Sequence, residues 1–155
     1  MIRDQIKLMS QVPITWKELE KYHLKTPDKE MYRHPKVQKA YDEFLEILSK
    51  QNLSINKYVL EAIFSDEYYS RPFIITKNKF PYNIEEKYAH LLIWLNPLYE
   101  VEESEILLFL KEKCEGNPFI LFKNDPQNSS VCLVTHYHLF VNKEYENVLC
   151  NIEVL

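Results

Sequence analysis

The chain has 155 residues, of which 46% are hydrophobic and 14% aromatic, and its formal net charge is −4. The length fits one domain over residues 1–155, and the hydrophobic content excludes a disordered chain. No cluster of lysines and arginines stands free of acidic neighbours, so a nucleic-acid partner is not expected. The chain's one glycine, Gly116, excludes glycine-rich phosphate-binding loops, which need several glycines.

The cysteines indicate a reducing environment. They are odd in number, widely spaced and form no C-x-x-C pair, which excludes a zinc ribbon and a thioredoxin motif. The sequence also has no secretory h-region and no run of about 18 apolar residues that would span a membrane. We therefore expect an intracellular, cytoplasmic and soluble protein without a membrane partner.

The first part of the chain, about residues 1–69, has the periodicity of helices. A capping box over residues 15–18 predicts a short helix to about Leu24. Apolar residues then recur at three- and four-residue steps over residues 35–50, which predicts an amphipathic helix. Ser54 is a suitable N-cap for a further helix.

The second part, about residues 70–155, contains short β-branched and aromatic runs. Ser104 is a suitable N-cap for one helix there, and a loop is expected over residues 78–84. Helices followed by strands around one helix predict a single-domain α+β fold. In it, the N-terminal helices pack on one face of an antiparallel or mixed sheet. The predicted strands cover residues 73–76, 90–95, 118–123 and 131–141.

The last predicted strand contains His136 and His138, two residues apart. Alternate residues of a strand point to the same face, so both imidazoles are expected side by side. The same parity places His90 and Trp94 together on a neighbouring strand. We expect these side chains and Phe140 to share one face of the sheet, where the imidazoles suit acid–base, nucleophilic or metal chemistry.

Five short motifs occur in order along the chain. They are I-T-W (14–16), N-K-F-P-Y (78–82), H-L-L-I-W (90–94), F-K-N (122–124) and S-V-x-x-x-x-H-x-H (130–138). Through these motifs the chain resembles the mainly fungal N-acetylglucosamine-induced protein family, a domain of unknown function. Lys79 and Phe80 stand where that family tends to have Asp and Trp, and the family implies no reaction.

The histidine strand also has a more distant likeness to histidine-triad nucleotide hydrolases and transferases. In those enzymes a strand histidine attacks an α-phosphate, which is nucleophilic catalysis in two steps. The triad is incomplete in this chain, because Phe140 occupies the position of a third alternating histidine.

The first functional hypothesis is a site for a small phosphorylated or nucleotide-like ligand, with His-dependent phosphoester hydrolase or transferase activity as a further step. Aromatic rings would stack on the base, amides would hydrogen-bond it, and the histidines and a lysine would contact phosphate. The candidate catalytic residues are His90, His136 and His138, and the candidate ligand-binding residues are Asn78, Phe80, Tyr82, Trp94, Lys123, Asn124 and Ser130.

Two alternatives remain open. Three imidazoles across two strands could hold zinc with one open coordination position. Alternatively, the domain is a non-enzymatic interaction module whose aromatic face contacts a protein partner or a second copy of the chain. The sequence does not decide among these hypotheses or whether the protein is an enzyme.

Overall fold

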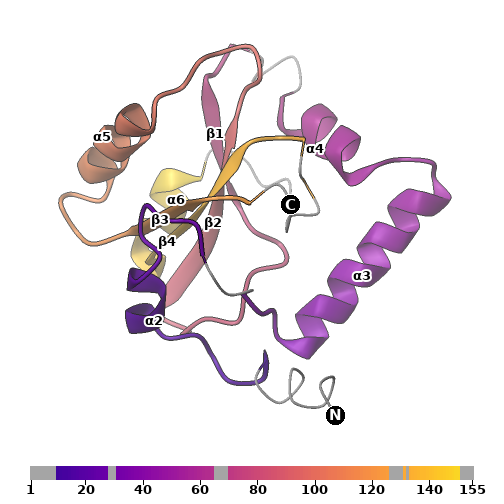
Figure 1. The fold of residues 1–155 in the computed structure, drawn as a ribbon, viewed down its shortest axis with the longest axis horizontal. Coiled ribbons are helices and arrows are strands. Elements are labelled where there is room, and N and C mark those ends of the chain that lie inside the picture. Colours follow the sequence, from indigo (N-terminus) through magenta and orange to yellow (C-terminus); the bar gives the residue numbers. More distant parts are fainter. Residues whose placement is uncertain (1–9, 28–30, 65–69, 126–130, 132, 151–155) are drawn as a thin grey trace.

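The computed structural model describes residues 10–27, 31–64, 70–125, 131 and 133–150. At its centre is a four-stranded sheet with the order β1-β2-β4-β3, in which every neighbouring pair is antiparallel (Figure 1). This arrangement confirms the predicted α+β class, with an antiparallel sheet. The strands are β1 (Phe73–Lys77), β2 (Tyr88–Leu95), β3 (Ile120–Lys123) and β4 (His136–Asn142).

The strand register assigns side chains to the two faces of the sheet. In the pairing of β2 with β4, Trp94 lies opposite His136 and His90 lies opposite Phe140. Residues paired in this way point to the same side of the sheet. We call this side the histidine face; its members are Ile74, Thr76, His90, Leu92, Trp94, Ile120, Phe122, His136, His138 and Phe140.

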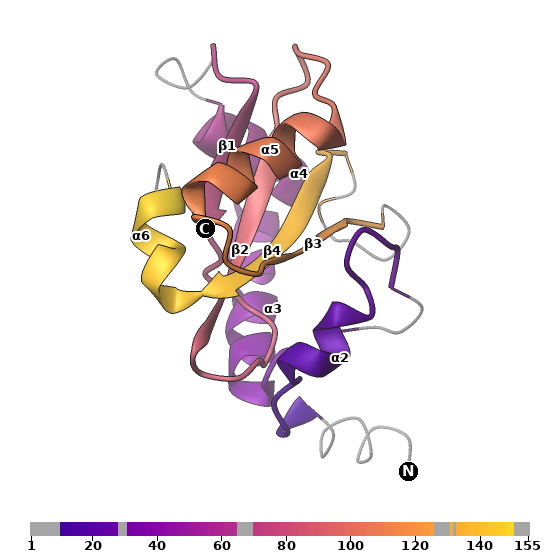
Figure 2. The same cartoon turned by 90° about the vertical axis from the view of Figure 1, so that its left-hand side faces the viewer.

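The opposite face carries a large apolar core. Helix α5 (Glu103–Lys113) packs on it through the fully buried Ile106 and Leu110. Helix α6 (Glu146–Leu149), which follows the 3-10 turn η1 (Lys143–Tyr145), adds Leu149 to the same cluster. In Figure 2 helix α5 lies in front of the strands and helix α6 lies to their left.

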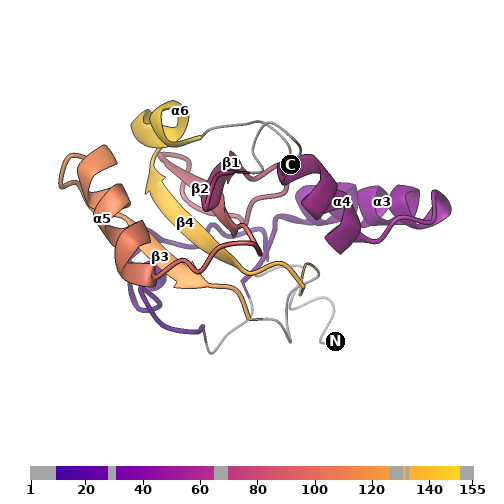
Figure 3. The ribbon, with the colours of Figure 1, turned by 90° about the horizontal axis from the view of Figure 1, so that it is seen from above.

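The N-terminal helices α3 (Pro35–Lys50) and α4 (Ile55–Ile63) lie on the side of the sheet away from α5, as Figure 3 shows from above. Helix α4 (Ile55–Ile63) contributes Val59 and Ile63 to a core cluster that contains Trp94. Helix α2 (Trp16–Glu20) contributes Leu19 to a cluster that contains Phe140. The N-terminal helices therefore pack on one face, as predicted, while α5 and α6 cover the other.

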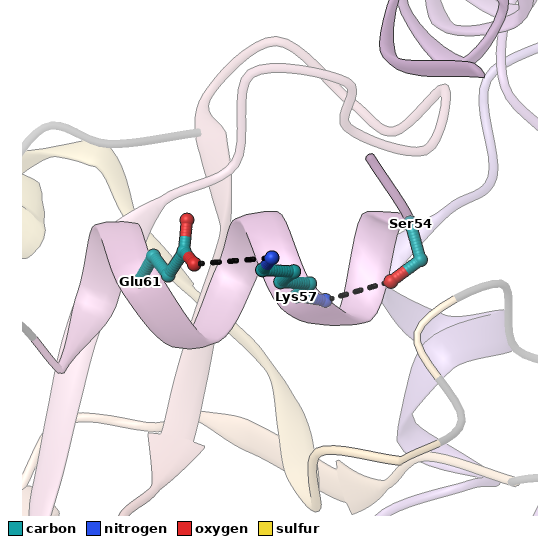
Figure 4. A network of polar contacts seen from close by, with 3 residues as sticks. All are labelled: Ser54, Lys57 and Glu61. Atoms are coloured by element: carbon teal, nitrogen blue, oxygen red, sulfur yellow. Dashed lines mark hydrogen bonds and ion pairs between the residues drawn. The ribbon is translucent and has the colours of Figure 1, made fainter. Parts of the chain in front are cut away.

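Three helices begin where their capping residues predict. Thr15 is the N-cap of α2, and its hydroxyl accepts a hydrogen bond from the backbone N–H of Glu18. Helix α3 (Pro35–Lys50) has Pro35 in its first turn, and the side chain of His34 accepts a hydrogen bond from a backbone N–H. At the start of α4, Ser54 Oγ accepts from the backbone N–H of Lys57 at 3.1 Å (Figure 4). Lys57 also forms an exposed ion pair with Glu61 at 3.9 Å. Exposed ion pairs of this kind add little to stability, whereas an N-cap adds about 1 kcal/mol.

Two helix boundaries differ from the predicted ones. Helix α2 ends at Glu20 and does not reach Leu24, which has a φ of 59° and donates its backbone N–H to the carbonyl of Leu121. Helix α5 takes Glu102 as its N-cap, so Ser104 lies inside the helix. Within the described ranges, no helix is long and apolar enough to cross a membrane.

Candidate functional site

His90, His136 and His138 lie together on the histidine face, and we call them the histidine cluster. The ring centroids of His90 and His138 are 5.1 Å apart, and those of His136 and His138 are 5.5 Å apart. His90 and His136 are each only 4% exposed, whereas His138 is partly accessible. The strand parity expected from the sequence therefore does bring the three imidazoles together.

The tautomer of His90 follows from its hydrogen-bond donors. The backbone N–H of Tyr82 donates to His90 Nδ1 at 3.0 Å. The Asn78 side chain lies 3.3 Å from the same nitrogen, and its Oδ1 accepts from the backbone N–H of Phe80. The amide NH₂ of Asn78 therefore faces His90. Two donors on Nδ1 require a lone pair there, so the ring proton is on Nε2.

His90 in turn sets the tautomer of His138. His90 Nε2 lies 2.9 Å from His138 Nδ1, and because Nε2 carries the proton, it donates. The proton of His138 is therefore on its own Nε2. Among the described residues, none accepts a hydrogen bond from this N–H. A chain of donors thus runs from Tyr82 through His90 to a free N–H on the most accessible ring of the cluster.

His136 has the opposite tautomer. Its Nδ1 lies 2.8 Å from the carbonyl oxygen of Val134, which can only accept, so Nδ1 carries the proton and Nε2 keeps a lone pair. The side-chain oxygen of Asn124 accepts from the His136 backbone N–H at 3.0 Å, and the backbone N–H of Asn124 donates to the His136 carbonyl. Strand β4 begins here, so the strand predicted from residue 131 is shorter than expected.

All three histidines are neutral at pH 7. Burial lowers the pKa of His136 to about 4. Burial also lowers the pKa of His90 and of His138 well below the ordinary value. A proton on a neighbouring imidazole of the cluster and the positive charge of Arg33 would each oppose protonation further. A proton on His90 Nδ1 would moreover face the donors of Tyr82 and Asn78.

Aromatic rings enclose the cluster. Tyr82, which is partly exposed, lies 4.6 Å from the His90 ring centroid and stacks on His138 at 5.3 Å. Phe140 stacks on His90 at 4.5 Å, and Phe122 lies 5.2 Å from His138. Of the three aromatic residues predicted to stack on a ligand base, Tyr82 is the one that borders the histidine cluster and is also partly exposed.

Trp94 and Phe80 do not fit the predicted stacking role. Trp94 lies 4.7 Å from His136 but is only 1% exposed, and its Nε1–H donates to Thr76 Oγ1. Phe80 is buried against Tyr41 and Phe44 of α3, with ring centroids 5.0 and 5.3 Å away. Both rings are core residues, because α3 and α4 cover the faces that a base would need.

Three further residues were predicted to contact the ligand, and the structure gives each a different position. Lys123 pairs with Tyr137, so the register places it on the face opposite the histidines, and it is removed from the site. Asn78 uses its amide to hold His90 and the loop before it, which makes it a positioning residue. Ser130 lies outside the described residues.

Asn124 carries an unsatisfied donor. Its side chain is buried, and its Nδ2 has no hydrogen-bond partner within the described part of the chain. A buried polar group without a partner costs about 1–3 kcal/mol, which an acceptor supplied by a ligand or a water would recover. Asn124 therefore remains a candidate ligand-binding residue next to His136.

Arg33 was not identified from the sequence. Its Nε donates to the carbonyl of Phe80 at 2.8 Å, and its guanidinium lies 4.3 Å from the Tyr41 ring and 5.5 Å from the Tyr82 ring. The chain has few arginines, and this one comes two residues before Pro35. No spacing in the sequence relates it to the histidine strands, so a spatial contact was needed to find it.

The cluster does not suit a three-histidine metal site. Both nitrogens of His90 and one nitrogen of each other ring are engaged in hydrogen bonds, so the ring lone pairs do not converge. Where the chain is described, no group of three or more His, Cys, Asp or Glu side chains could hold a metal ion. The described residues therefore do not supply the three converging ligands that the zinc hypothesis requires.

The interaction-module hypothesis expected the aromatic face at the surface. The structure instead buries Trp94, Phe122 and Phe140 under the N-terminal helices. That surface is therefore not open to a partner, and contact with another protein or a second copy elsewhere stays a prediction.

The fold and the cluster define a class: an α+β domain with a covered histidine cluster on an antiparallel sheet. The chain belongs to the family described as "Protein of unknown function (DUF3605)", whose model matches residues 15–142. This confirms the family predicted from the motifs.

A solved structure, "Crystal Structure of HTC1", is similar, with a TM-score of 0.58 and 18% identity over 83% of this chain and 84% of that one. Such identity shows the fold alone. No curated protein matches the chain. The likeness to histidine-triad enzymes stays a prediction.

Proposed function

We propose that this domain binds a phosphorylated, nucleotide-like small molecule at the histidine cluster. The observation that carries the proposal is the Nε2–H of His138, which no described residue accepts. Its ring is held by His90, which is held by the backbone of Tyr82. A donor oriented in this way suits a phosphate oxygen, because little conformational entropy is lost on binding.

Tyr82 supports the nucleotide-like character of the ligand. Its ring is partly exposed and already stacks on His138, so it borders the proposed phosphate donor. A planar base could pack against the exposed part of this ring, and base–aromatic contacts contribute up to about 1–3 kcal/mol.

The test is a binding titration of the full chain with nucleoside mono-, di- and triphosphates and with inorganic phosphate. Calorimetry and the ring ¹⁵N resonances of His138 are followed together. In His138→Asn the side-chain oxygen can still accept from His90, but the outer N–H is lost. We expect at least a ~10-fold loss of affinity, which corresponds to about 1.4 kcal/mol.

The matched control is His23→Asn, another histidine whose Nδ1 accepts a backbone hydrogen bond. It should bind like the wild type. Binding by His138→Asn at wild-type affinity, or no response of the wild type to any member of the panel, contradicts the proposal.

A second candidate function is phosphoanhydride cleavage, and the tautomer of His136 favours it. Its neutral Nε2 lone pair could attack phosphorus, so that a P–N bond forms and a P–O bond breaks with the electron pair leaving on phosphate. Water would then cleave the P–N bond and release its proton to solvent. Neutral His138 is a weak acid, so a leaving group of low pKa is required.

Turnover of nucleoside diphosphates and dinucleoside polyphosphates tests this candidate. His136→Asn keeps a donor for the Val134 carbonyl and removes the Nε2 lone pair. We expect this variant to lose turnover while it keeps its fold. Equal turnover by the wild type and His136→Asn would exclude His136 as the nucleophile.

A further inference from the structure

We propose that Arg33 binds the anionic group of the ligand at the histidine cluster. The inference rests on the proposed function and deepens it, because it names the residue that distinguishes a phosphorylated ligand from an uncharged one.

Arg33 is held in place before any ligand arrives. Its Nε donates to the Phe80 carbonyl at 2.8 Å, and the guanidinium lies over the rings of Tyr41 and Tyr82 at 4.3 and 5.5 Å. Both distances are within the roughly 6 Å range of cation–π contacts. Through the described part of the chain, no residue accepts a hydrogen bond from the two terminal NH₂ groups, which are the donors that chelate phosphate.

Tyr82 connects Arg33 to the cluster. The same ring lies 5.5 Å from the guanidinium and 5.3 Å from the His138 ring centroid. Arg33, Tyr82 and His138 therefore form a continuous row. The Arg33 charge lies near enough to add to the lowering of the pKa of His90 and of His138, which burial mainly causes.

The charge balance of this row indicates an anion. In the described segments, no carboxylate forms an ion pair with Arg33, and the neighbouring histidines are neutral at pH 7. Arg33 is also half-buried, so solvent screens its charge less than at an open surface. A phosphate would supply the missing negative charge and accept from both Arg33 and the His138 Nε2–H.

The experiment compares a nucleotide with its nucleoside. Calorimetry measures AMP, adenosine and inorganic phosphate binding to the wild type, Arg33→Gln and Arg33→Lys. We expect Arg33→Gln to bind AMP at least ~10-fold more weakly, with adenosine affinity changed by less than ~2-fold. Arg33→Lys should be intermediate, because lysine keeps the charge but loses the planar fork.

The matched control is Lys113→Gln, which makes the same charge change at the end of α5, on the other side of the sheet. It should leave AMP binding unchanged, and an equal loss in this control would assign the effect to net charge and overturn the inference. If Arg33→Gln does not fold, the pKa of His138 in the wild type, measured with and without phosphate, still tests the inference. Bound phosphate beside Arg33 and His138 should raise the pKa of His138, and no change on saturation overturns the inference.

The two proposals fail differently. Wild-type binding of AMP that Arg33→Gln retains overturns the role of Arg33 and leaves the site at His138 standing. No binding of AMP, adenosine or phosphate by the wild type overturns both.

Discussion

His90 and His138 share a hydrogen bond of 2.9 Å between Nε2 and Nδ1, although they are 48 positions apart in the chain. The donors behind His90 decide its direction, so one backbone N–H determines which nitrogen of a ring on the neighbouring strand carries a proton. The cluster is therefore ordered by hydrogen bonds as well as by packing. Because His90 fixes the tautomer and the ring orientation of His138, the Nε2–H donor of His138 has a defined position.

The tautomers can be observed directly. Long-range ¹H–¹⁵N spectra at pH 7 should show the proton on Nε2 in His90 and His138 and on Nδ1 in His136, because Val134 accepts from the latter. Three rings in one cluster would thus give two different patterns. A proton on Nδ1 of His90 would break the donor chain and contradict the assignment.

Stability should fall on acidification below about pH 6.5. The folded state lowers the pKa of His136 from 6.5 to about 4, so between these values the unfolded chain binds a proton that the folded chain does not. The contribution of His136 to the free energy of unfolding is therefore complete above pH 6.5 and is lost as the pH falls toward the lowered pKa. For His136 the loss is on the order of 3 kcal/mol, and His90 and His138 act in the same direction.

Urea denaturation between pH 4 and pH 7.5 measures this dependence. His136→Asn cannot titrate but keeps the donor for Val134, so its stability should depend less steeply on pH. A curve parallel to that of the wild type would show that His136 is not the group that titrates.

The hydrogen bond between Trp94 and Thr76, next to His136, can be tested by its contribution to stability. Trp94 Nε1–H donates to Thr76 Oγ1 at 2.9 Å, and both side chains are buried. Thr76→Val keeps the shape and leaves the indole N–H without a partner, which should cost about 1–3 kcal/mol. Thr76→Ser retains the hydroxyl and should be less destabilised by this measure. Equal unfolding free energies for the two variants would show that the hydrogen bond contributes nothing.

Strand parity made part of the site predictable. Because side chains alternate along β2 and β4, the sequence alone placed His90, His136 and His138 on one face with Trp94 and Phe140. The caps at Pro35 and Ser54 were predictable for a similar reason, since they depend on residues a few positions apart. Local periodicity carries this information without any tertiary contact.

The rest of the site depends on contacts between distant segments. Lys123 was misplaced because only the pairing of β3 with β4 shows which of its residues share a face with the histidines. Arg33 reaches the cluster through Tyr82, 49 positions further along the chain (82 − 33), and no pattern encodes that contact. The sequence made Trp94 and Phe80 plausible ligand contacts, because a helix that covers a residue leaves no sign in the segment around that residue.

His23, to which the sequence assigned no role, protects the edge of the sheet. Its Nδ1 accepts from the backbone N–H of Leu121 on the edge strand β3 at 3.0 Å, and Leu24 donates to the carbonyl of the same residue. Leu121 is fully buried, so His23→Ala would leave its N–H unsatisfied at a cost of about 1–3 kcal/mol. Amide exchange at Leu121 should become faster, because the outer hydrogen bond of β3 is lost.

His23→Asn is the matched variant, because its side-chain oxygen can accept in place of Nδ1. It should keep most of the stability and the slow exchange of the wild type. Protonation should act like His23→Ala. Burial lowers the pKa of His23 and the charge of Glu103 partly opposes this, so the hydrogen bond survives somewhat below pH 6.5 and is lost as the pH falls through the lowered pKa. If the alanine and asparagine variants have the same Leu121 exchange rate, packing rather than this hydrogen bond holds the edge of β3.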